Sequence, residues 1–185
     1  MRAAGGGRLA LAGRRRLDGQ GAPGRREKGP NPTDRAKPGT KRSLIVERGG
    51  GPLGVAIAGA NVHDAKLLAT TIEAIVVARP DPAAYPQHLC LDKGYDNPSG
   101  REAAEQAGYT PHIRRIGEER LDQAGKKRRP ARRWVVERTL AWLSKCRAIL
   151  IRYDKKPTNY LGLIQLACAL LWYRRLHRLQ EAEAN

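Results

Sequence analysis

The sequence lacks phenylalanine and has few cysteines, and both shortages narrow what the protein can be. Without Phe, stacking on nucleic-acid bases has to use Trp or Tyr. The three cysteines, Cys90, Cys146 and Cys168, lie far apart in apolar segments. This is typical of buried thiols in a reducing cytoplasm and not of a disulfide framework or a zinc site. The longest apolar run, residues 160–173, is interrupted by Gln165 and is shorter than the roughly 18 residues of a membrane span. We therefore expect a cytoplasmic protein without a membrane partner.

Acidic residues are also scarce. There are 18 Asp and Glu against 35 Lys and Arg, which gives a net charge of +17. Such an excess predicts a polyanionic partner, most often nucleic acid, although a merely soluble basic protein is the alternative. No H-E-x-x-H motif and no phosphate-binding G-x-x-x-x-G-K-[ST] loop is present, so neither chemistry is expected.

The first fifty residues differ from the rest, because they hold 11 of the 20 glycines and 13 basic residues against 4 acidic ones. Such a composition buries too little apolar surface to offset the entropy of ordering. We predict a disordered basic segment over residues 1–16 and mostly irregular chain over 17–40. The length of 185 residues suits one domain. We place it at residues 17–180, with a tail at 181–185.

Apolar periodicity and turn residues predict a mixed α/β domain in which helices cover a sheet. The glycines at 49–51 indicate a hairpin turn, Asn61 or His63 caps the first helix, and Pro111 marks an edge strand. Strands are expected at residues 41–47, 52–60, 88–92 and 109–115, helices at 64–78, 101–108, 133–153 and 159–180, and a basic loop at 116–132.

Three acidic residues stand in unusual places. Asp92 ends a buried strand, where α/β sheets place ligands, or else it caps the following turn. Glu137 lies in the apolar helix segment WVVERTLAWL, where Arg133 or Arg138 could pair with it. Asp18 lies among Gly and Arg residues and is on local grounds a loop acid. A few carboxylates from separate elements can hold divalent metals for phosphodiester cleavage, while a basic surface holds the DNA backbone.

Several segments in order resemble the DDE transposases of the insertion-sequence-five group: GPNPTDRAKPGTKRSLIV, GVAIAGANVHDAKLL, LCLDKGYDNPSGREA and RRWVVERTLAWLSKCRAIL. The resemblance implies an α/β, RNase H-like mixed sheet flanked by helices. It implies three catalytic acids that bind Mg²⁺ or Mn²⁺, which match Asp18, Asp92 and Glu137, and an arginine four positions before the Glu, which matches Arg133.

The resemblance also implies the activity. The chain is expected to bind double-stranded DNA at element ends and target, to cleave it and transfer strands, and to act as a homo-oligomer at the nucleoid. The basic residues expected to contact DNA are Arg35, Lys37, Lys41, Arg42, Lys126, Lys127, Arg128, Arg129, Arg132, Arg133 and Lys145.

The segment around Asp18 departs from the family pattern, because RLALAGRRRL replaces the apolar strand that should carry the first acid. We therefore expect a truncated or frameshifted copy that binds DNA but transfers strands poorly. The alternatives are a non-catalytic DNA-binding remnant and a fragment without function.

Overall fold

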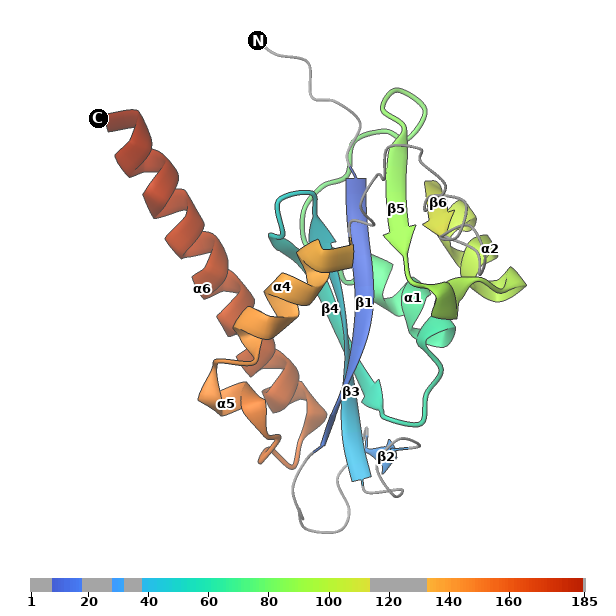
Figure 1. Ribbon diagram of the computed structural model, residues 1–185, viewed down its shortest axis with the longest axis vertical. Coiled ribbons are helices and arrows are strands. Elements are labelled where there is room, and N and C mark those ends of the chain that lie inside the picture. Colours follow the sequence, from blue (N-terminus) through green and yellow to red (C-terminus); the bar gives the residue numbers. More distant parts are fainter. Residues whose placement is uncertain (1–7, 18–27, 32–37, 114–132, 185) are drawn as a thin grey trace, which may run out of the picture.

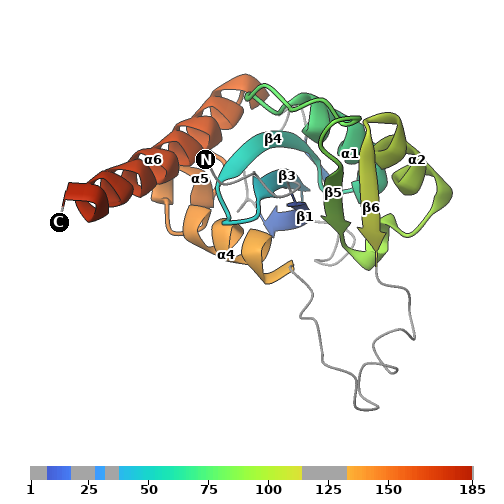
Figure 2. The same ribbon diagram turned by 90° about the horizontal axis from the view of Figure 1, so that it is seen from above.

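One mixed sheet lies between two layers of helices in the computed structural model, which describes residues 8–17, 28–31, 38–113 and 133–184 (Figures 1 and 2). The order across the sheet is β2-β3-β1-β5-β6, and β4 also pairs with β3. Strand β3 is antiparallel to its three neighbours, whereas β5 runs parallel to β1 and β6. The expected mixed α/β architecture is confirmed. The strands are β1 (Arg8–Leu17), β2 (Gly29–Pro30), β3 (Pro38–Glu47), β4 (Pro52–Gly59), β5 (Gln87–Leu91) and β6 (Tyr109–Ile113).

The predicted disorder of residues 1–16 is wrong over β1, which occupies the centre of the sheet. This strand pairs with β3 from Leu9 to Leu17 and with β5 from Arg8 to Ala10. Its Arg-rich sequence has weak strand propensity, but its pairing on two edges depends on neighbours that are distant in the sequence. The irregular region expected over residues 17–40 likewise contains β2 and the first residues of β3.

Alternating residues of β3 supply both halves of the core. Leu44 and Val46 pack with residues of one helical layer, whereas Ile45 packs with residues of the other. The first layer consists of α4 (Arg133–Leu143), α5 (Arg147–Leu150) and α6 (Pro157–Ala184), and the second of α1 (Asp64–Glu73) and α2 (Pro98–Gln106). Among the described residues, no helix is both long and apolar enough to cross a membrane.

Helix α1 is capped by His63, as expected, but it ends at Glu73 and not at residue 78. After Ala74 the chain turns to meet strand β4, where the Val76 amide donates to the Leu53 carbonyl at 3.2 Å. Pairing with an edge strand therefore replaces the last helical turn. Helix α2 begins three residues before its predicted start, because Asn97 caps it and Pro98 occupies its first turn.

The long helix predicted over residues 133–153 is broken into α4 and α5. At the break, the amides of Lys145 and Cys146 donate to carbonyls three residues back, and the Ser144 hydroxyl donates to the Leu140 carbonyl. The 181–185 tail is wrong as far as Ala184, because α6 continues through it. There Glu181 pairs with His177 one turn earlier, at 3.2 Å.

Two predicted DNA contacts, Lys41 and Arg42, are buried in β3, with 0% and 1% of their surfaces exposed. The structure therefore contradicts that part of the predicted DNA interface. Helices cover both faces of this central strand, so neither adjacent side chain reaches solvent. The Lys41 ammonium donates to the Val62 carbonyl and forms an ion pair with Asp64 at 2.9 Å.

We predict that Asp64→Ala destabilises the fold more than removal of an exposed acid does, because it leaves the buried Lys41 ammonium without its carboxylate. Removing one member of a buried ion pair costs about 3–5 kcal/mol. Since the Asp64 side chain stays 30% exposed, we expect a smaller loss of about 2 kcal/mol. Urea denaturation measures the free energy of unfolding. Glu105→Ala, at an exposed site on α2, is the control, and equal losses in both variants would contradict the assignment.

Candidate active site and nucleic-acid interface

Asp92 directly follows β5, the strand between β1 and β6. Leu89 and Leu91 belong to the core beneath α1 and α2, whereas Cys90 packs against the core beneath α4 and α6. Asp92 has extended backbone angles, so strand alternation assigns it to the face of Cys90. Its carboxylate accepts a hydrogen bond from the Lys93 amide at 2.6 Å and caps a short 3-10 helix, η1 (Lys93–Tyr95). Asp92 therefore both ends the strand and caps the turn that follows it.

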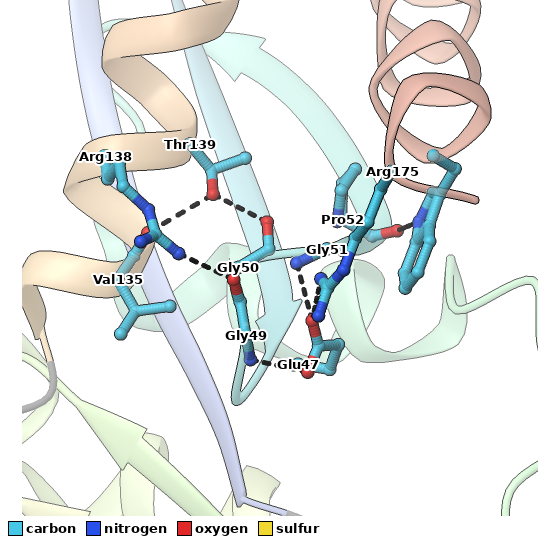
Figure 3. Close-up of polar contacts among 10 residues, drawn as sticks. Glu47, Gly49, Gly50, Gly51, Pro52, Val135, Arg138, Thr139 and Arg175 are labelled. Carbon is cyan, nitrogen blue, oxygen red and sulfur yellow. Dashed lines mark hydrogen bonds and ion pairs between the residues drawn. The ribbon is translucent and has the colours of Figure 1, made fainter. Parts of the chain in front are cut away.

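Glu137 is exposed on α4, the helix that covers this same face. Two neighbours on α4 are bound to the β3–β4 turn: Arg138 donates to the Gly49 carbonyl at 2.6 Å and Thr139 to the Gly50 carbonyl at 2.7 Å (Figure 3). Glu137 is about 200° around the helix from Thr139. It therefore lies on the side of α4 roughly opposite the Thr139 contact. Asp92 and the helix that carries Glu137 are thus on the same face of the sheet.

Glu47 fastens the β3–β4 turn that holds α4 in place. Its carboxylate accepts hydrogen bonds from the amides of Gly49 and Gly51 at 2.5 and 2.8 Å and pairs with Arg175 of α6 at 2.6 Å (Figure 3). Gly50 has a φ of 94°, which favours glycine. The turn is therefore bound to both α4 and α6.

Tyr95 lies in the LDKGYD motif three positions after Asp92 and was not singled out by the sequence analysis; it packs in the core beneath α1 and α2. Its side chain is 1% exposed. Burial raises the pKa of its hydroxyl, and the negative charges of Asp64 and Asp92 raise that pKa further. The Tyr95 hydroxyl therefore stays protonated at neutral pH.

Most of the remaining predicted site residues lie outside the described part of the chain. This holds for the proposed first metal ligand, Asp18, and for the expected DNA contacts Arg35, Lys37, Lys126, Lys127, Arg128, Arg129 and Arg132. Arg133 begins α4, four positions before Glu137. Lys145 is exposed just after the end of α4.

A divalent metal does not find its full set of ligands among the described residues. No cluster of three or more His, Cys, Asp or Glu side chains occurs there. Asp92 and Glu137 are two carboxylates on one face, and the ten residues of β1, RLALAGRRRL, include no acid. The described residues are therefore one carboxylate short of the three that the family resemblance implies.

Comparison with known proteins assigns this arrangement to a class. A profile of the transposase DDE domain matches residues 14–172. The chain therefore belongs to the DDE transposase domain family, whose members carry out nuclease-type phosphoryl transfer. A protein of Burkholderia cepacia, the transposase assigned to insertion sequence element IS402, is 36% identical over 162 residues, or 86% of this chain and 74% of that protein. The chain is thus a bacterial insertion-sequence transposase of the DDE type. A solved piggyBac transposase synaptic complex with hairpin DNA aligns with 68% of this chain and 27% of that one, at 14% identity and a TM-score of 0.37.

We predict that Thr139→Val destabilises the protein by about 1–2 kcal/mol, because the buried Gly50 carbonyl loses its hydroxyl donor. The free energy of unfolding in urea measures this loss. Thr70→Val, the same substitution at an exposed position of α1, should change stability by less than about 0.5 kcal/mol. A Thr139→Val protein as stable as the control would show that this contact does not hold α4.

A second prediction concerns pH. Burial alone would raise the pKa of Glu47, but the Gly49 and Gly51 amides and Arg175 together lower it below the ordinary value. A carboxyl whose folded pKa lies below its unfolded value stabilises the fold above the unfolded pKa, and this contribution is lost as pH falls through the folded pKa. Glu47→Gln should therefore lose less stability than the unmodified chain between about pH 5 and about pH 3. Urea denaturation at a series of pH values measures the free energy of unfolding of both proteins. If this free energy fell equally in both between these pH values, the prediction would be contradicted.

Proposed function

We propose that this chain is the RNase H-like core of a transposase of the insertion-sequence-five group, and that it binds double-stranded DNA at element ends and at the target. Metal-dependent cleavage and strand transfer, with Mg²⁺ or Mn²⁺, is the reaction for which we propose this core. One observation carries the proposal: Asp92 ends β5 on the sheet face covered by α4, the helix that holds Glu137. Three antiparallel strands followed by parallel β5 and β6 support the RNase H-like assignment.

The anchor points of the 116–132 loop support a role in holding DNA at these carboxylates. The loop follows β6, whose last residue, Ile113, pairs with Leu91 immediately before Asp92. It leads into α4 at Arg133, four positions before Glu137. The segment that contains the basic residues 126–129 thus connects β6, the neighbour of the strand that Asp92 follows, with α4, which holds Glu137. A positive charge at this place would hold the phosphate backbone across the site.

A second candidate function is DNA binding without catalysis, and the lack of any acid in β1 favours it. Both candidates share the DNA interface and differ in the chemistry. We propose a homo-oligomer working at the nucleoid for either one, since transposition joins two element ends.

We predict that replacing Lys126, Lys127, Arg128 and Arg129 with Ala flattens the dependence of DNA affinity on salt. Each phosphate contact that is lost should lower the slope of log affinity against log salt by about 0.9. Fluorescence anisotropy of a labelled duplex over a range of NaCl concentrations measures the slope. The control replaces four basic residues that are exposed elsewhere in the structure, Lys155, Lys156, Arg174 and Arg178. If only the control changed the slope, the loop would be excluded from the DNA footprint.

A nicking assay on element-end DNA separates the two candidate functions. Magnesium-dependent cleavage that is lost in both Asp92→Asn and Glu137→Gln would establish catalysis. Salt-dependent binding without cleavage would establish the non-catalytic remnant. A chain that shows neither property would contradict the proposed function.

A further inference from the structure

The register of β1 against β5 identifies the backbone position that lies beside Asp92. The two strands are parallel neighbours, with Arg8 opposite His88, Leu9 opposite Leu89 and Ala10 opposite Cys90. Continuing this register by two residues brings position 12 opposite Asp92. On this extrapolated register, position 12 is the residue of β1 that corresponds to the strand-end carboxylate.

The pairing of β1 with β3 assigns position 12 to a face of the sheet. Ala12 is the register partner of Leu44, and directly opposed residues of an antiparallel pair share a face. Leu44 belongs to the core beneath α4, together with Val136, and α4 itself contacts β1 and β3. Position 12 consequently lies on the face shared by Asp92 and Glu137.

The chain has alanine at this position, and its nearest acid in the sequence lies well beyond it. Leu17, the last residue of β1, is five residues past Ala12, or about 16 Å at the rise of a strand. Two catalytic metals are only about 3.5–4 Å apart and share their ligands. None of the ten residues of β1 is an acid, and Asp18 lies outside the described residues.

We propose that position 12, and not Asp18, is the place of the third metal-binding carboxylate, and that Ala12 deprives this chain of it. The inference rests on the proposed function and favours its second candidate: the chain binds DNA but holds divalent metal weakly, through Asp92 and Glu137 alone. A carboxylate placed at position 12 completes the set.

The test is Mn²⁺ binding, measured by electron paramagnetic resonance of the free ion on the whole chain. Ala12→Asp should bind Mn²⁺ about tenfold or more tightly than the unmodified chain, because even groups one hydrogen bond away from a metal change its affinity by about 10- to 100-fold. Ala12→Asn has nearly the same shape without the charge, so it should show no gain. Adding Asp92→Asn to Ala12→Asp should abolish the gain. A folded Ala12→Asp protein with unchanged affinity would overturn the proposal.

A second arm does not depend on how Ala12→Asp folds. In the otherwise unmodified chain, Asp18→Ala should leave the weak Mn²⁺ affinity unchanged, whereas Asp92→Asn should lower it. Equal losses in these two variants would return Asp18 to the site and refute the role of position 12. Duplex binding measured on the same samples tests the proposed function separately. Failure of DNA binding alongside a Mn²⁺ gain refutes only the function, and DNA binding without the gain refutes only this inference.

Discussion

The parallel pairing of β1 with β5 is the constraint on which the candidate site depends. It decides which residue of the central strand is the neighbour of Asp92, and the side-chain period of two in a strand leaves no room for adjustment. A shift of one residue would exchange the faces of all ten residues of β1. Because β3 pairs with β1 along nearly its whole length, such a shift would also disturb the hairpin that β3 makes with β4. The position beside Asp92 is therefore set by strand pairing in the sheet.

Glu137, the second carboxylate that we propose for the site, is positioned from the opposite end of the sheet. Its helix is held by bonds from Arg138 and Thr139 to the turn after β3, and Glu47 ties that turn to α6. A glutamate exposed on a helix is thus placed by contacts that its two neighbours in the sequence make. The position of Glu137 therefore depends on the three-glycine turn at residues 49–51, although the turn has no catalytic group of its own.

The parts of the fold that local sequence determines could be predicted, and those that depend on distant pairing could not. The β3–β4 hairpin, the strand ending at Asp92 and the helix carrying Glu137 follow from glycine turns and apolar periodicity within a few residues. Strand β1 has no such signal, because its pairing partners begin some thirty residues later. The break between α4 and α5 contains neither Gly nor Pro, so only tertiary packing reveals it.

Charge predicted the class of protein correctly, but it was the least reliable guide to which single residues are available to contact DNA. Lys41 and Arg42 count fully toward a net charge of +17, yet both are buried in the middle of the sheet. DNA affinity nevertheless tolerates such losses, since each phosphate contact contributes a similar, nearly independent increment. A metal site has no such tolerance, because it needs a few carboxylates converging at one point. A single alanine in β1 can therefore separate the two properties and leave a basic chain that holds DNA without the ligand set required to cut it.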